Sequence, residues 1–466
     1  MLFSSIPFLY YFLPCVLILY FLSPRCLKNL VLLISSLVFY GWGEPKYVLL
    51  MVISIFVGYI SGLLIEKFQD SVYSKISMIS GAVIALGFLV YYKYVDFFIE
   101  NFNAVTGLSV SVLKIALPIG ISFYTFQIVS YIIDVYRKET KAQHNLISLA
   151  AYITMFPQLI AGPIVRYVDI EVQLRERKHS VDKISLGARR FILGLGKKIL
   201  IANALGELCD IFRETAGPSV LFAWIYGIAF SLHIYFDFSG YSDMAIGLGH
   251  IFGFDFLENF NYPYISKSVT EFWRRWHMSL GSWFRDYLYI PLGGNRVGKF
   301  RWFFNIFVVW FATGFWHGAA WNFIVWGLMF GVLLVLEKLF LLNFLKKHNV
   351  LSHFYVLFIV MISFIIFNAP TMSQAWVDIT SLFGAGNLPL VTVDTLYYLR
   401  SYAVIFVIAF IGATPLIKII INKIYGTSFG KKILNVAEPV VLTTLLIVMT
   451  AFLVDGSFNP FLYFRF

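Results

Sequence analysis

The chain has 466 residues, of which 59% are hydrophobic, 19% aromatic and only 13% charged. A soluble domain cannot bury that much apolar surface, so the composition excludes a soluble globular protein and indicates an integral membrane protein. The net charge of +11 does not indicate nucleic-acid binding, because the Lys and Arg residues cluster in loops between hydrophobic segments. These segments lack the short alternation of outer-membrane strands, so we expect an all-α polytopic bundle.

The hydrophobic segments in the first third of the chain predict helices that cross the membrane in alternation. An N-terminus outside the cell places the basic loop 137–144 on the inner side, in agreement with the positive-inside rule. The predicted spans are residues 6–22, 29–40, 47–65, 76–94 and 114–136.

Residues 146–165 break this alternation, because a full crossing would leave the basic stretch 166–198 outside. Pro157, Gly162 and Pro163 instead predict a helix that enters the membrane, breaks and returns on the same side. Such a re-entrant backbone is tolerated only where it lines a protein cavity.

The rest of the chain predicts further spans around an inner basic segment and an outer loop. Between residues 199 and 261 the number of crossings, and so the side on which each span ends, stays open. The basic segment 267–301 is expected inside. The loop 368–399, which contains no Lys or Arg, is expected outside. The predicted spans are 220–236, 241–256, 302–316, 319–342, 354–367, 402–421 and 439–454.

The segments together predict about eleven transmembrane helices, with additional re-entrant and interfacial helices, in a single domain of residues 1–466. The catalytic core is expected at about 114–342, and a C-terminal tail, 455–466, at the outer face. Cys15, Cys26 and Cys209 fit no metal or redox spacing and are interpreted as packing residues. We predict no metal site and no bound cofactor.

Two motifs of soluble enzymes are present but lack their structural context. The stretch "GGNRVGKF" has the spacing of a phosphate-binding loop, but Phe300 stands where a Mg²⁺-binding Ser or Thr is required. The stretch "GTSFG", residues 426–430, matches a nucleophile elbow, yet it lies in a short basic loop and is interpreted as a turn.

The segment "EFWRRWHMSLGSWFRDYLYIPLGGNR", residues 271–296, has the period of an amphipathic helix, with tryptophans on one face and His277 at the edge of that face. One interpretation is an anchor at the membrane surface, in contact with lipid. The other is a binding site, in which Arg274, Arg275 and Arg285 receive an anionic donor with phosphate groups.

His317 lies in the apolar stretch "TGFWHGAAWNFIVWG". Sixteen helical residues from Arg301 rise ~24 Å, short of the ~30 Å of the hydrocarbon core, so the imidazole is expected inside the membrane. An ionisable residue there is a functional candidate, although a hydrogen bond to a neighbouring helix, with Gly314 and Gly318 allowing close packing, is the alternative. Trp316 and Trp321 are expected to contact substrate.

Four further polar residues lie in apolar segments: Asp237, Asp243, Gln127 and Gln158. Each is a candidate to orient a catalytic histidine, but hydrogen bonding between helices is the favoured interpretation.

The motifs together resemble the membrane-bound O-acyltransferase (MBOAT) family, and within it the bacterial alginate (AlgI-type) and peptidoglycan (PatA-type) O-acetyltransferases. The resemblance covers almost the whole chain in order, and it implies a ring of helices around a central funnel, where an inside donor meets an outside acceptor. It places the family's near-invariant histidine on His317 and its second polar position on His277. The motifs that carry it include "LPIGISFYTFQ", "FPQLIAGPI", "YFDFSGYSDMAIGLG", "NFNYPYISKSVTEFWRRWH", "WFRDYLYIPLGGNR" and "FWHGAAWNFIVWG".

This resemblance implies acetyl transfer from acetyl-CoA, in the bacterial cytoplasmic (inner) membrane, to a cell-envelope polymer, with an extracytoplasmic protein as partner. A neutral imidazole at His317 is suited to remove the proton of an attacking hydroxyl, and His277 is expected to position the acyl group or polarise its carbonyl. Tyr463, in the tail "SFNPFLYFRF", is either part of an aromatic anchor or an acyl relay. The relay interpretation draws on a resemblance to the tail of a small partner peptide in teichoic-acid D-alanylation.

Two non-enzymatic functions remain as alternatives. A transporter or flippase for a lipid-linked sugar predicts that substrate movement survives the loss of His317. A scaffold that docks an extracytoplasmic enzyme predicts that His317 is dispensable for the complex.

Overall fold

The computed structural model of the protein describes residues 2–215 and 217–456. All regular secondary structure in these residues is helical. The described residues form two compact units, the first within Met1–Phe191 and Met244–Leu257, the second within Ile192–Asp243 and Glu258–Phe466. The helices α9 (Val181–Gly196) and α11 (Val220–Ile251) each contribute residues to both units.

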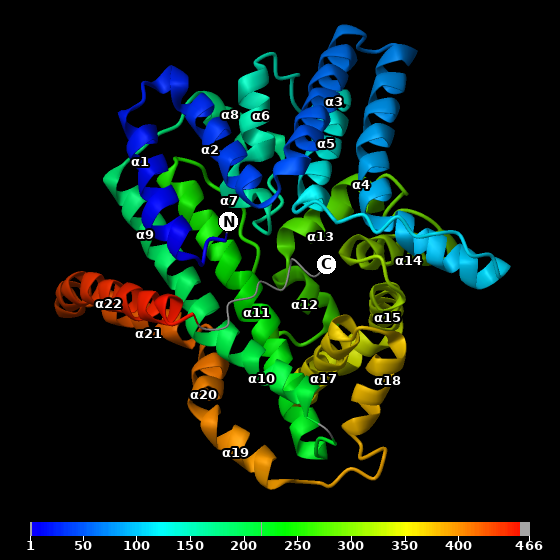
Figure 1. Ribbon diagram of the computed structural model, residues 1–466, viewed down its shortest axis with the longest axis vertical. Coiled ribbons are helices and arrows are strands. Elements are labelled where there is room, and N and C mark those ends of the chain that lie inside the picture. The colour runs from blue at the N-terminus through cyan, green and yellow to red at the C-terminus, as the bar shows by residue number, and fades with distance from the viewer. Residues whose placement is uncertain (1, 216, 457–466) are drawn as a thin grey trace. The chain divides into compact units, whose positions relative to one another are not determined.

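The first unit contains long apolar helices together with several shorter ones (Figure 1). Its helices before α9 are η1 (Pro7–Phe12), α1 (Leu13–Leu22), η2 (Arg25–Leu27), α2 (Lys28–Gly43), η3 (Pro45–Tyr47), α3 (Val48–Lys67), α4 (Val72–Thr106), α5 (Ile121–Tyr136), α6 (Leu146–Thr154), α7 (Phe156–Leu159) and α8 (Tyr167–Arg175).

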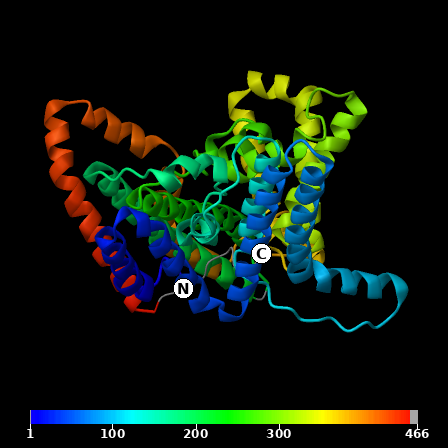
Figure 2. The same cartoon turned by 90° about the horizontal axis from the view of Figure 1, so that it is seen from above.

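Small residues let α3, α4 and α5 pack closely on one another, side by side in Figures 1 and 2. A Cβ atom on Gly81 of α4 would lie 2.3 Å from Oγ of Ser61 in α3, and a Cβ atom on Gly62 would lie 2.6 Å from the hydroxyl of Tyr131 in α5. Neither position has room for a side chain, which is the usual role of small residues in membrane helix packing.

The break predicted within residues 146–165 is confirmed. Helix α6 ends at Thr154, Met155 has non-helical backbone angles, and the short α7 follows. Pro157 occupies the first turn of α7, where its missing N–H is tolerated. The residues from Ser148 to Val165 are buried, so this irregular backbone is enclosed by protein.

The second unit holds a core rich in aromatic residues and most of the candidate site residues. Its helices, apart from α9 and α11, are η4 (Lys197–Ala202), α10 (Asn203–Glu214), η5 (Pro263–Ile265), α12 (Val269–Arg275), α13 (Met278–Phe284), η6 (Arg285–Tyr289), α14 (Lys299–His317), α15 (Trp321–Leu336), η7 (Glu337–Leu341), α16 (Leu342–Lys347), α17 (Asn349–Asn368), α18 (Met372–Ser381), α19 (Val393–Ser401), α20 (Ala403–Gly412), α21 (Leu416–Tyr425) and α22 (Ser428–Val454).

The prediction of two spans at 220–236 and 241–256 is wrong, because α11 runs unbroken from Val220 to Ile251. The polar stretch "DFSGYSD" lies inside this helix rather than in a loop. Its carboxylates Asp237 and Asp243 form ion pairs with Lys198 and Lys197, so the polar groups are compensated without leaving the helix.

The predicted span 402–421 is also interrupted. Helix α20 ends at Gly412 and α21 begins at Leu416, directly after Pro415, whose ring and missing N–H disfavour a continuous helix. Helix α21 is largely exposed and carries Lys418 and Lys423.

The chain is a multi-pass membrane protein. Its described residues contain seven helices that are long and apolar enough to cross a membrane, or eight if α19 and α20, bent by 52°, form one broken span. The predicted count of eleven is therefore not confirmed. Helix α5, counted among the predicted spans, has only 16 residues, fewer than the ~20 that a full crossing requires.

Candidate active site

His317 is the last residue of α14 and lies in an aromatic environment within the second unit. Gly318 follows in extended backbone, and α15 begins three residues later. The buried imidazole ring lies 4.9 Å from the ring of Trp316, 5.1 Å from that of Trp326 and 5.3 Å from that of Phe367, centroid to centroid. All three contacts are edge-to-face, so aromatic residues from α14, α15 and α17 fix the plane of the imidazole.

The glycines around His317 serve helix packing. A Cβ atom on Gly314 would lie 2.3 Å from the carbonyl oxygen of Phe323, and one on Gly318 would lie 2.2 Å from the ring of Phe323. A Cβ atom on Gly327 would meet the backbone of α14. The space beside Gly314 and Gly318 is filled by α15, which supports the close-packing interpretation of these two glycines.

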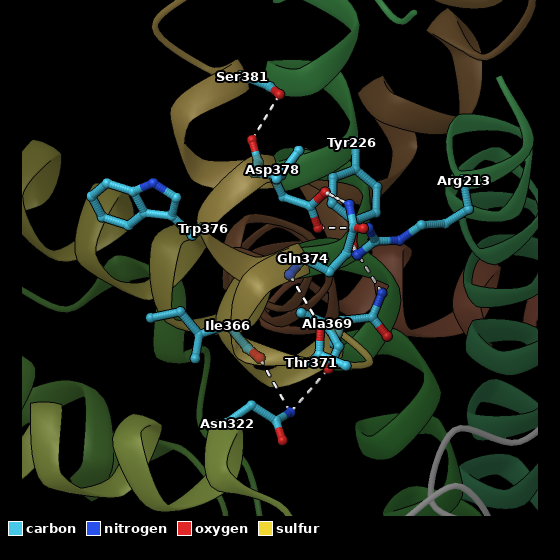
Figure 3. A network of polar contacts seen from close by, with 12 residues as sticks. Arg213, Tyr226, Asn322, Ile366, Ala369, Thr371, Gln374, Trp376, Asp378 and Ser381 are labelled. Atoms are coloured by element: carbon cyan, nitrogen blue, oxygen red, sulfur yellow. Dashed lines mark hydrogen bonds and ion pairs between the residues drawn. The ribbon is translucent and has the colours of Figure 1, made fainter. Parts of the chain in front are cut away.

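Asn322 connects the start of α15 to the end of α17 (Figure 3). Its amide nitrogen donates to the carbonyl oxygens of Ala369, Phe367 and Ile366, at 3.1, 3.3 and 3.4 Å. The last carbonyls of a helix have no intrahelical donor, so Asn322 satisfies them and holds Phe367 against His317. The only sequence signal for this role is one amide in an apolar run just after His317.

A polar network continues from this helix end toward α18, α10 and α11 (Figure 3). Asp378 of α18 forms an ion pair with Arg213 at 2.6 Å and accepts a hydrogen bond from Gln374 at 2.8 Å. Arg213 also donates to the hydroxyl of Tyr226, which accepts a second bond from Asn368 at 2.9 Å. This network buries the carboxylate of α18, whereas Trp376 and Val377 of the same helix are exposed.

The prediction of one continuous amphipathic helix over 271–296 is wrong. Helix α12 ends at Arg275, and α13 begins at Met278. His277, between them, has φ 45° and ψ 52°, in the left-handed region that non-glycine residues rarely adopt. Hydrogen bonds from a distant segment replace the helical ones, since the N–H of Met278 donates to Asn259 and the carbonyl of Arg275 accepts from the N–H of Asn261.

The apolar face of this segment packs within the protein. Trp276, Leu280 and Trp283 are buried. The ring of Trp273 lies 4.8 Å from that of Trp310 and 4.9 Å from that of Phe330. The tryptophans of this segment therefore contact protein rather than lipid, which argues against the interpretation as a surface anchor.

His277 is fully enclosed. Its ring is 2% exposed and meets the ring of Phe238 edge-to-face at 4.7 Å. The helices α12 and α13 lie outside the candidate membrane spans. Burial lowers the pKa of His277 from its ordinary value to about 3, so the imidazole is neutral at physiological pH.

Trp316 joins the two histidines. Its ring lies 6.2 Å from that of His277 and 4.9 Å from that of His317. The structure therefore brings together three residues that the sequence singled out: His277, from the break between α12 and α13, and Trp316 and His317, from the end of α14. Trp321, in contrast, is 56% exposed at the start of α15.

Glu337, which the sequence interpretation missed, supports the segment that leads to His277. Its side chain is completely buried and accepts hydrogen bonds from the backbone N–H groups of Val269 and Thr270, at 2.6 and 2.9 Å, and from the Thr270 hydroxyl at 2.6 Å. A carboxylate there satisfies donors at the N-terminus of α12 that have no helical partner. An acidic residue in an apolar helix was the available signal.

The carboxylates Asp237 and Asp243 lie on α11 next to the π-helical turn η4. Oδ1 of Asp237 is 2.6 Å from Nζ of Lys198, with both side chains almost fully buried, and Oδ2 of Asp243 is 2.6 Å from Nζ of Lys197, with both partly exposed. These pairs support the interpretation of both carboxylates as links between helices.

The arginines differ in their surroundings. Arg275 forms an ion pair with Glu271 at 2.9 Å, and Arg285 forms one with Asp286 at 2.7 Å. Arg274 and Arg285 are exposed, and Arg275 is partly buried.

The remaining predicted site residues lie in the first unit or outside the described part of the chain. Gln127 is buried in α5, and Gln158 of α7 donates to the carbonyl oxygen of Tyr152 at 2.7 Å. Tyr463 lies outside the described residues. Within the described residues, no group of three or more His, Cys, Asp or Glu side chains is arranged to hold a metal ion.

These features define an all-α, multi-pass membrane protein in which two buried histidines contact the same tryptophan ring. A family model, "MBOAT, membrane-bound O-acyltransferase family", matches residues 135–371, which include both histidines. The chain belongs to this family and is an O-acyltransferase.

Relatives extend the similarity over most or all of the chain. The probable alginate O-acetylase AlgI of Pseudomonas putida is 38% identical over 100% of both chains. The probable alginate O-acetylase AlgI of Pseudomonas aeruginosa is 44% identical over 84% of this chain and 76% of its own. The peptidoglycan O-acetyltransferase of Helicobacter pylori is 33% identical over 84% of this chain and 81% of its own.

Proposed function

We propose that this protein transfers acetyl from cytoplasmic acetyl-CoA across the bacterial inner membrane, for O-acetylation of an envelope polysaccharide or peptidoglycan. The observation that supports a catalytic site most strongly is the convergence of His277 and His317 on Trp316. The names of the relatives, alginate O-acetylase and peptidoglycan O-acetyltransferase, support the acetyl group and the class of acceptor.

In this proposal His317 is the general base. It takes the proton of an acceptor hydroxyl while the oxygen attacks the thioester carbonyl carbon. The new C–O bond forms, the C–S bond breaks, and the coenzyme A thiolate leaves and receives the proton. Since Trp326 and Phe367 hold the ring of His317 edge-on, its orientation is set before substrate binds.

The donor approaches from the inner side and the acceptor from the outer side. Arg274, Arg275 and Arg285 bind the phosphate groups of acetyl-CoA, and Trp316 and Trp321 contact the substrates. An extracytoplasmic partner delivers the acetyl group to the polymer. In the tail, Tyr463 serves as a relay: its hydroxyl takes the acetyl group at the first transfer and yields it to the partner at the second.

Replacing His317 by alanine in cells tests this proposal. We expect the envelope polymer to lose its O-acetyl groups, measured as acetate released by mild alkali, while the amount of protein in the membrane is unchanged. His348→Ala is the matched control, because His348 is exposed at the start of α17. Near wild-type acetylation in the His317→Ala strain would leave a transporter or a scaffold as the function.

A further inference from the structure

Asn259 contacts three consecutive residues at the break between α12 and α13. Its Oδ1 lies 3.0 Å from Nδ1 of His277 and accepts hydrogen bonds from the hydroxyl and the backbone N–H of Ser279, at 2.9 and 3.3 Å. Its backbone carbonyl accepts from the N–H of Met278 at 3.0 Å. Its Nδ2 donates to the hydroxyl oxygen of Ser242 at 3.0 Å. Asn259 is 1% exposed, so these bonds form away from solvent.

The partners of Asn259 determine which way its amide points. An asparagine amide turned by 180° has nearly the same shape, so its orientation follows from its hydrogen bonds. The backbone N–H of Ser279 can only donate, so the amide atom that faces it must be the oxygen. The turned amide would place two donors against each other in a buried site, which is costly.

The orientation of Asn259 determines the proton position on His277. Because Oδ1 can only accept, Nδ1 of His277 must carry the proton in their shared hydrogen bond. Burial keeps this imidazole neutral. A neutral imidazole has one ring proton, so Nε2 then carries a lone pair.

We propose that Asn259 is a positioning residue that fixes His277 as the Nδ1–H tautomer, so that Nε2 acts as a hydrogen-bond acceptor during acyl transfer. This inference rests on the proposed function of the histidine pair. In this proposal, Nε2 of His277 accepts a hydrogen bond from an N–H or O–H group of the bound substrates. It also replaces the expectation that His277 polarises the acyl carbonyl, because that task requires a proton on Nε2.

The tautomer can be measured without acetyl transfer. Solid-state NMR of the full chain in lipid, labelled with ¹⁵N-histidine, separates protonated from unprotonated ring nitrogens, and subtraction of the His277→Gln spectrum assigns His277. We expect protonated Nδ1 and unprotonated Nε2 at pH 7 in the wild type. In Asn259→Leu we expect the proton to redistribute toward Nε2.

Kinetics tests what the tautomer does. Asn259→Leu should lower kcat by ~10²-fold, as expected for a misdirected histidine, with little change in the KM for acetyl-CoA. Asn259→Asp keeps an acceptor beside Nδ1 and should retain the tautomer and most of the activity. Asn261→Leu is the matched control, because Asn261 is exposed two residues away and the bonds described for it use its backbone.

The outcomes separate this inference from the proposed function. An Nε2–H tautomer in the wild type, or an unchanged His277 spectrum in Asn259→Leu, would overturn it. Equal loss of kcat in Asn259→Asp and Asn259→Leu, with the Nδ1–H tautomer kept in both, would also overturn it. Full activity of His277→Gln would also overturn it, because Nε2 would then have no role in acyl transfer, whereas near wild-type acetylation in the His317→Ala strain would contradict the proposed function.

Discussion

The two ion pairs of α11 have the same length but different burial, so they test how burial changes the contribution of an ion pair to the free energy of unfolding. The oxygen-to-nitrogen distance is 2.6 Å in both, yet the Asp237 and Lys198 side chains are 1% and 2% exposed, against 18% and 29% for Asp243 and Lys197. Neutralising one carboxylate leaves a lysine charge behind. In the buried pair this charge has little access to water, and the expected loss of unfolding free energy is ~3–5 kcal/mol.

The partly exposed pair should respond less. Lys197 is less enclosed by protein than Lys198, so we expect Asp243→Asn to destabilise the protein by only ~1 kcal/mol. The assay is unfolding by sodium dodecyl sulfate in mixed micelles, followed by tryptophan fluorescence, for Asp237→Asn, Asp243→Asn and the double variant Asp237→Asn with Lys198→Met.

The double variant removes both charges of the buried pair and should recover most of the stability lost in Asp237→Asn. Equal destabilisation by Asp237→Asn and Asp243→Asn would refute the argument from burial. A double variant less stable than Asp237→Asn would refute the argument from charge compensation.

Three further predictions concern the site and its surroundings. In steady-state kinetics, Arg274→Glu should raise the KM for acetyl-CoA, and more strongly at low salt. An unchanged KM would show that Arg274 does not bind the donor. Glu337→Gln should lower thermal stability in detergent, because a neutral amide accepts the α12 N–H groups more weakly than a carboxylate; melting at the wild-type temperature would contradict the capping role. Tyr463→Phe should abolish polymer acetylation while the protein stays folded, and mass spectrometry should find acetyl on the wild-type C-terminal peptide; normal acetylation by the variant would make the tail an anchor.

Composition and hydropathy were sufficient to predict the class of this protein. Long apolar helices require only local sequence, and so does the break at residues 146–165, where prolines and glycine stand in an apolar run. The unbroken course of α11 was not predictable in this way. The stretch "DFSGYSD" is typical of a loop until Lys197 and Lys198, about forty residues earlier, are known to lie beside it.

The site shows the same limit. The periodicity of residues 271–296 indicates one helix. The turn of the backbone at His277 is explained by two hydrogen bonds to a distant segment, in which the Asn259 carbonyl accepts and the Asn261 N–H donates. The two histidines were identified because each is an ionisable group near apolar sequence and because the motifs resemble a family. Their shared contact with Trp316, and the supporting role of Asn322, depend on which helices pack together.

The central claim is that His317 carries acetyl transfer from an inside donor to an outside acceptor. Its most direct test uses the purified full chain in sealed lipid vesicles, with radiolabelled acetyl-CoA on the side of the basic loops and alginate or peptidoglycan oligosaccharides on the other. For the wild type we predict release of the coenzyme A thiol together with label on the protein or the acceptor, and for His317→Gln neither above background. Transfer by His317→Gln at the wild-type rate would contradict the claim.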